Sequence, residues 1–208
     1  MAPETAAALI GDALALFNAE PDIEITLEAN PSSVEAAAFA GLAAAGVNRV
    51  SLGLQSLDDE ALHFLGRLHG VEEGLKALDT AQRVFKRVNA DFIYARPGQT
   101  EDDWRAELTS ALALGTDHLS LYQLTIEPGT RFATDVRLGA FTPLDDDPAA
   151  DLFAMTAAMC WHPPVRRWTT CKSSTACLAT GTWPWPPTTG AKAAWAGPWH
   201  ATRLRACR

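Results

Sequence analysis

The strongest constraint on this fold is a repeated alternation of strand-like and helix-like segments in the first 125 residues. Four short segments alternate apolar and polar residues with a period of two, which is typical of strands with one buried face. The strands expected from this pattern are residues 23–28, 49–55, 88–94 and 118–124. Since the intervening segments are long enough for helices, the pattern predicts an α/β fold with a parallel sheet.

Helix starts can be placed from capping signals. A serine or threonine followed three residues later by an acidic residue is the spacing of a capping box. The pairs with this spacing are Ser32 with Glu35, Ser56 with Asp59, and Thr100 with Asp103. Two further helices are expected over residues 4–19 and 72–86.

Each predicted strand has only one apolar face, which favours a barrel or part of one, because strands of a doubly wound sheet are usually apolar on both faces. The polar face places Glu28, Gln55 and Asp91 near the carboxyl ends of their strands, where (β/α) barrels carry their chemistry. The alternatives are hydrogen bonds to neighbouring loops, or an acid–base pair of Glu28 and Asp91 in an unrelated lyase or hydrolase.

Four segments in order resemble one known family: EITLEANPSSV, GVNRVSLGLQSLDDEALHFLGRLH, DFIYARPGQT and HLSLYQLTIEPGT. They are similar to the HemW and oxygen-independent coproporphyrinogen III oxidase-like family of the radical SAM superfamily. The resemblance covers about residues 1–159. It implies a partial (β/α) barrel with about four of six parallel strands, the third to the sixth, and a chain that begins at the family's second helix.

The resemblance also implies S-adenosylmethionine, a [4Fe–4S] cluster and a haem-linked role. That role is either coproporphyrinogen dehydrogenation or haem delivery to an acceptor protein, with haem itself as a possible ligand. Carried over by motif, the residues that would contact S-adenosylmethionine are Glu28, Gln55, Arg67, Asp91 and Thr125. Carboxylates accept hydrogen bonds from hydroxyl and amino groups, and an arginine can bind a carboxylate as a fork.

The chain departs from the family at the cluster site. The family's three ligands form a CxxxCxxC loop, and neither this loop nor the glycine-rich GGGTP-type segment is present. Residues 1–159 contain no cysteine, and the four cysteines, at 160, 171, 177 and 207, match no cluster or zinc spacing. No metal site, no catalytic residue and no radical chemistry are therefore expected in this chain. Arg96 stands where the family has an apolar residue and is expected to crowd or recharge the ligand mouth.

Composition changes abruptly after residue 159. Residues 1–159 hold all 25 acidic residues. The last 49 residues hold no acidic residue, but they hold seven basic residues and six of the seven tryptophans. One interpretation is a basic, tryptophan-rich tail that binds a membrane surface or RNA. The favoured one is out-of-frame translation of a GC-rich gene, because composition and family match break together. We expect a partial barrel over 1–159 and an irregular, disordered tail over 160–208.

The remaining expectations concern the class of protein. The net charge of −8 gives no sign of a nucleic-acid partner, and no run of 18 apolar residues or secretory signal is present. A cytoplasmic protein with a small-molecule ligand is expected. Two functions remain open: a radical SAM protein of this family, or a clusterless barrel fragment that binds S-adenosylmethionine or haem without catalysis.

Overall fold

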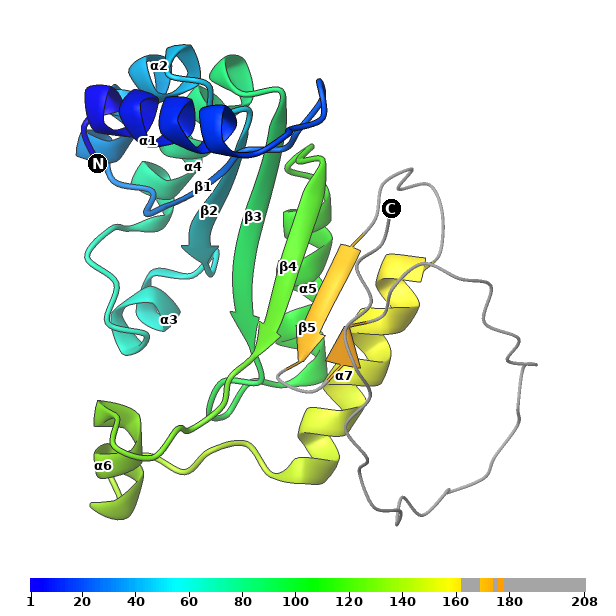
Figure 1. The fold of residues 1–208 in the computed structure, drawn as a ribbon. Helices are drawn as coiled ribbons and strands as arrows, with labels where there is room; N and C mark the ends of the chain where they lie inside the picture. Colours follow the sequence, from blue (N-terminus) through cyan, green and yellow to red (C-terminus); the bar gives the residue numbers. More distant parts are fainter. Residues whose placement is uncertain (162–168, 174–175, 178–208) are drawn as a thin grey trace. The chain divides into compact units, whose positions relative to one another are not determined.

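The computed structural model describes residues 1–161, 169–173 and 176–177 and contains one mixed sheet in the order β1-β2-β3-β4-β5-β6 (Figure 1). The strands are β1 Thr26–Ala29, β2 Arg49–Gln55, β3 Arg87–Tyr94, β4 His118–Gln123, β5 Thr169–Ser173 and β6 Ala176–Cys177. Strands β1 to β4 are adjacent and parallel, which confirms the expected α/β arrangement. Strand β5 is also parallel to β4, whereas β6 is antiparallel to β5.

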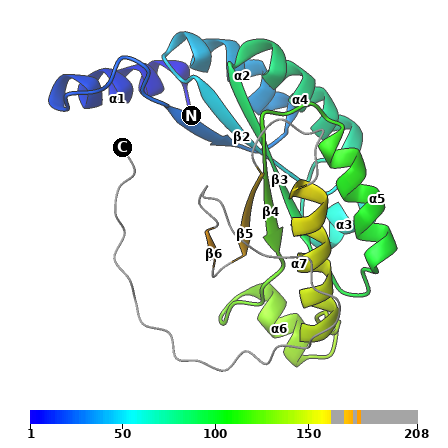
Figure 2. The ribbon, with the colours of Figure 1, turned by 90° about the vertical axis from the view of Figure 1, so that its right-hand side faces the viewer.

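Four of the described helices cover one face of this sheet. The helices are α1 Pro3–Leu16, α2 Ser33–Ala44, α3 Asp59–Phe64, α4 Val71–Val84, α5 Glu101–Leu112, α6 Arg131–Arg137 and α7 Asp146–Trp161. Figure 2 shows α2, α4, α5 and α7 along the same side of the strands. The short helices α3 and α6 follow the carboxyl ends of β2 and β4 (Figure 1). The face of β1–β4 opposite the four covering helices is called the open face below.

Two of the three expected helix caps are present. The Ser32 hydroxyl accepts a hydrogen bond from the Glu35 amide at 3.3 Å, and Thr100 and Asp103 form a complete capping box. The expected cap at Ser56 is wrong, because Asp58 caps α3 and accepts from the Ala61 amide at 2.8 Å. The Ser56 hydroxyl instead contacts a side chain on α5, as described below.

The core lies between the sheet and its covering helices. Val50, Leu52 and Leu54 of β2 are at most 2 % exposed and belong to the core, as their alternation predicts. Trp104 of α5 is fully buried, stacks on Tyr94 of β3 with ring centroids 5.0 Å apart, and donates a 2.7 Å hydrogen bond to Thr156 of α7. This tryptophan therefore joins the sheet to two helices.

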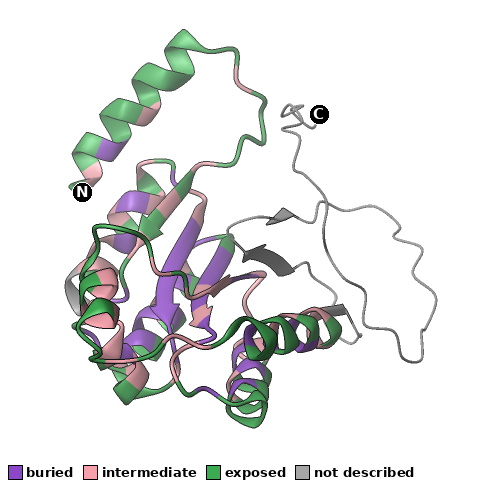
Figure 3. Ribbon diagram, turned by 90° about the horizontal axis from the view of Figure 1, so that it is seen from below, coloured by how far each residue is buried: buried purple, intermediate pink, exposed green. Residues whose placement is uncertain are grey.

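Helix α1 is less well covered than the other long helices, as Figure 3 shows by its exposed surface. It contacts α2 closely, because Pro3 lies where a side chain on Gly41 would stand, with its Cγ 2.7 Å from the position of an added Cβ. Leu9, Leu16 and Phe17 are nevertheless 57 %, 79 % and 72 % exposed. Among the described strands, β1 pairs only with β2, so one of its edges carries no neighbouring strand.

Short segments of the tail, which was expected to be irregular, form regular secondary structure. Helix α7 continues to Trp161, and the backbone of β5 hydrogen-bonds to the edge of β4. An unpaired parallel edge offers peptide groups for such pairing whatever the side chains are. The expected disorder of the tail otherwise falls on residues 162–168, 174–175 and 178–208, which lie outside the described residues. No helix in the described ranges is both long and apolar enough to span a membrane.

Candidate functional site

A polar cavity of about 310 Å³ lies on the open face. It is formed by the polar positions of strands whose apolar positions, such as Leu27 and Leu121, belong to or pack against the core on the opposite side. The lining residues are Glu24, Thr26, Glu28, Arg49, Ser51, His118, Ser120 and Tyr122. The period-two pattern of the sequence therefore produces a hydrophilic surface assembled from several strands.

Asp91 is at the centre of a hydrogen-bonded cluster beside this cavity. Its carboxylate accepts from the Ser51 hydroxyl at 3.1 Å and from the Asn89 amide at 2.8 Å. The Asn89 amide also donates to Ser51 and Ser120, and its carbonyl oxygen contacts the His118 ring. Three adjacent strands thus hold the Asp91 carboxylate in place.

The electrostatic environment of Asp91 favours its neutral form. Burial raises the pKa of Asp91 above its usual value, the nearby charge of Glu28 raises it further, and the hydrogen bonds from Ser51 and Asn89 offset part of the change. The ionised form of this carboxyl group beside the cavity therefore comes at a cost in stability.

We expect Asp91→Asn to be more stable than the wild-type chain near neutral pH. A folded-state pKa above the unfolded value stabilises the fold below the unfolded pKa, near 3.8, and this stabilisation is lost as pH rises through the folded pKa. The melting temperature of the variant minus that of the wild type should therefore increase between about pH 3 and pH 7. A difference that does not change with pH would contradict this expectation.

Glu24 provides a control of opposite sign. Burial raises its pKa, but the hydrogen bond from Arg87 and the charge of Arg49 outweigh burial and lower the pKa overall. The Arg87 and Glu24 side chains are 2.6 Å apart. Glu24→Gln should therefore be less stable than wild type near neutral pH, and the deficit should disappear as pH falls through the folded pKa.

The structure brings two of the five sequence-predicted ligand residues together. Glu28 lines the cavity and interacts with Asp91, as the strand alternation predicts. Gln55 ends β2, and its Nε2 would be 2.7 Å from a Cβ built on Gly53, so its amide lies over that glycine. Glu28 is the one of the five in the cavity lining, which does not include Asp91, Gln55, Arg67 or Thr125.

Arg67 and Thr125 lie in segments that follow the strands. Arg67 is in the connection between α3 and α4, where its Nε is buried and makes no hydrogen bond within the described residues. Thr125 is exposed just after β4. The ligand contacts of all five residues stay predictions at this point.

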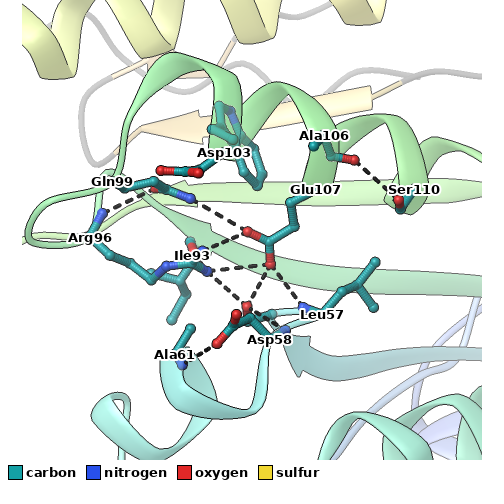
Figure 4. Close-up of polar contacts among 12 residues, drawn as sticks. Leu57, Asp58, Ala61, Ile93, Arg96, Gln99, Asp103, Ala106, Glu107 and Ser110 are labelled. Carbon is teal, nitrogen blue, oxygen red and sulfur yellow. Dashed lines mark hydrogen bonds and ion pairs between the residues drawn. The ribbon is translucent and has the colours of Figure 1, made fainter.

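The sequence suggested that Arg96 would change the charge of the ligand site, but the structure shows this arginine paired with an acidic residue. Its guanidinium forms a 2.6 Å ion pair with Glu107 of α5, and both side chains are largely buried (Figure 4). The arginine charge is therefore neutralised inside the protein. Sequence reasoning missed Glu107, because the one available signal was an acidic residue between the apolar positions Trp104 and Leu108 of a helix.

No group of three histidine, cysteine or acidic side chains in the described part of the chain is arranged to hold a metal ion. Cys160, the cysteine whose side chain is described, lies on α7 and packs against the core. It is therefore on the helical side of the sheet, away from the open face.

Comparison with known proteins places the chain among related sequences. Residues 3–110 match the family model described as the radical SAM superfamily. The chain is 42 % identical over 152 residues to the mitochondrial radical S-adenosyl methionine domain-containing protein 1 of Bos taurus, covering 73 % of this chain and 34 % of that protein. It is 42 % identical over 135 residues to the heme chaperone HemW of Escherichia coli, covering 64 % and 34 %.

A solved structure agrees with these relatives. The coproporphyrinogen III oxidase HemN of Escherichia coli, described as a radical SAM enzyme, superposes with a TM-score of 0.63 at 26 % identity and covers 76 % of this chain and 37 % of that one. The chain spans about a third of the length of the curated relatives it matches.

Proposed function

The chain belongs to the radical SAM superfamily, in its HemW- and HemN-like group, and on that premise we propose that its open face binds S-adenosylmethionine. The observation that carries the proposal is the placement of Glu28 and Asp91 beside one polar cavity. Both carboxylates come from family-like motifs and meet although they are more than 60 residues apart in the chain.

The chemistry of these groups suits that ligand. S-Adenosylmethionine presents ribose hydroxyls, an ammonium group and a positively charged sulfonium, all of which are favoured near carboxylates. Gln55 can both donate to and accept from the ligand. Arg67 has a buried Nε without a hydrogen bond in the described residues, and a ligand carboxylate would supply the missing acceptor.

The residues present do not fit the family's [4Fe–4S] cluster. Such a cluster needs thiolate ligands, and the first 159 residues have no cysteine. The second candidate function, a clusterless module that binds S-adenosylmethionine or haem without catalysis, is favoured by this fact. For the 208 residues given, we propose ligand binding without radical chemistry.

The wider biological role is also a proposal. The names of the bacterial relatives point to haem handling, and we propose a haem-linked role in which a porphyrin or haem and a haem-acceptor protein are further partners. A cytoplasmic location is the expectation from the sequence, and it remains a prediction because several relatives are named as mitochondrial.

Arg67→Met is expected to weaken binding of S-adenosylmethionine by about tenfold or more, since a hydrogen bond to a charged group contributes about 1.5–3 kcal/mol. The measurement is calorimetric titration of the purified chain with S-adenosylmethionine and, separately, with 5′-methylthioadenosine. The second compound lacks the amino acid part of the ligand. Its affinity should not change in the variant, because Arg67 would have no carboxylate to bind.

The matched control is Arg105→Met, which removes an arginine that is half exposed and pairs with Glu101 on the outer surface of α5. This control should bind both compounds as the wild type does. Equal losses for both compounds in the Arg67 variant would contradict the assigned contact. A wild-type chain that binds neither compound would overturn the proposed function.

A further inference from the structure

A buried polar network joins the segment after β2 to the segment after β3. Arg96 donates to Glu107 at 2.6 Å, to the Ser56 hydroxyl at 2.9 Å and to the carbonyl oxygen of Ile93 at 3.2 Å. Glu107 in turn accepts from the Ser56 hydroxyl at 2.5 Å and from the Leu57 amide at 2.8 Å (Figure 4). We call Arg96, Glu107, Ser56 and the Leu57 amide the rim latch.

The rim latch is built too deeply to be an ordinary surface ion pair. The Arg96 and Glu107 side chains are only 11 % and 8 % exposed, whereas the other ion pairs of α4 and α5 are at least half exposed. Burying two charges costs desolvation that their attraction often does not exceed, so net stability is a weak reason for such a pair. A second role of buried pairs is to specify one conformation.

The backbone next to the rim latch shows which conformation is specified. Gln55 and Ala95 have φ values of +69° and +58°, and they are the non-glycine residues with positive φ in the described part of the chain. Each immediately precedes a residue of the latch, Ser56 and Arg96 respectively. Such left-handed residues are strained and persist only where their surroundings hold them.

This geometry also directs the Gln55 side chain. The pairing of β2 with β3 shifts register between Leu52 and Gln55, and the Gln55 amide then lies over Gly53. Glu107 binds the next two residues, Ser56 and Leu57, and so fixes the chain directly after Gln55. The position of this amide thus depends on contacts made about 50 residues away along the chain.

We propose that Arg96 and Glu107 are positioning residues that hold Gln55 in its left-handed conformation and so present its amide to the adenosine part of the ligand. The ligand in this inference rests on the proposed function, whereas the effect of Arg96 and Glu107 on the conformation of Gln55 does not. It assigns a purpose to the largely buried arginine that directly precedes the PGQT segment.

The test uses the double variant Arg96→Met/Glu107→Gln, which removes both charges together and leaves no unpaired buried ion. Its affinity for S-adenosylmethionine should fall by about tenfold, because the Gln55 hydrogen bonds to the ligand would be lost. In a Gln55→Ala background the same double change should cause no further loss of affinity for S-adenosylmethionine. A general structural defect would instead weaken binding equally in both backgrounds.

Two further variants complete the design. Arg96→Lys keeps the charge but cannot bind Glu107 and Ser56 together as a fork. This single variant should therefore retain only part of the wild-type affinity for S-adenosylmethionine. Glu101→Gln/Arg105→Met removes an exposed ion pair from the same helix and should leave binding unchanged.

Nuclear magnetic resonance without ligand separates this inference from the proposed function. The ¹³C shifts of Gln55 should move from left-handed to extended values in the double variant and stay unchanged in the Glu101/Arg105 control. If the wild type binds no S-adenosylmethionine but these shifts move, the proposed function fails and the positioning role stands. The positioning role is overturned if the double variant changes neither the Gln55 shifts nor the affinity for S-adenosylmethionine. It is also overturned if the double variant lowers this affinity as much in the Gln55→Ala background as in the wild type.

Discussion

No 5′-deoxyadenosine is expected when the 208-residue chain is given iron, sulfide, S-adenosylmethionine and a reductant under anaerobic conditions. Reductive cleavage requires a cluster held by thiolates, and residues 1–159 supply none. Cys160 lies on α7, on the helical side of the sheet, while Glu28 and Asp91 face the other side. The measurement is chromatographic detection of 5′-deoxyadenosine, together with iron and sulfide analysis.

The control for this experiment is a radical SAM protein with an intact CxxxCxxC loop, treated in parallel and expected to form the product. Product from the wild-type chain would overturn the expectation. The chain with all four cysteines replaced by serine would then show whether Cys160, Cys171, Cys177 and Cys207 had supplied the ligands.

Trp104→Ala is expected to lower the free energy of unfolding by about 3–5 kcal/mol, as for other large aromatic residues removed from a core. The indole is fully buried, stacks on Tyr94 and donates to Thr156, so its loss leaves a cavity and removes a hydrogen bond between α5 and α7. Urea unfolding followed by circular dichroism measures the change.

Phe17→Ala is the matched control, because this aromatic residue is 72 % exposed just after α1. Its removal should change stability by no more than about 0.5 kcal/mol. Similar losses in the two variants would mean that Trp104 does not join sheet and helices as described. Trp104→Phe keeps the stacking but not the hydrogen bond, so its loss of unfolding free energy should lie between those of Trp104→Ala and Phe17→Ala.

Local patterns predicted the framework of this fold well. The alternation of apolar and polar residues located β2, β3 and β4, and the Thr100 capping box located the start of α5, because both signals depend on residues close in sequence. Strand β1 begins later than the alternation suggests, at Thr26, where its pairing with Arg49 starts. Helices α6 and α7 were not expected.

The site was predicted in part for the same reason. Alternation places Glu28 and Asp91 on one face, and the structure agrees. The expected position at the carboxyl end of a strand is wrong for Asp91, which lies in the middle of β3, and the cavity lining includes the first residues of β1, β2 and β4. The role of Ser56 was misassigned, since its spacing to Asp59 mimics a capping box while its hydroxyl binds Glu107, 51 residues away. Pairings over such distances leave no trace in a single sequence, so the rim latch required the structure.

The unpaired outer edge of β1 and the exposed apolar residues at the end of α1 govern how this chain behaves at high concentration. Among the described residues the outer edge of β1 has no neighbouring strand, and Leu16 and Phe17 expose apolar side chains, and both features favour association between molecules. Two features oppose it: the edge strand is only four residues long, and Glu28 places a carboxylate within it. The short length of β1 and the charged side chain within it therefore limit edge-to-edge association of this chain.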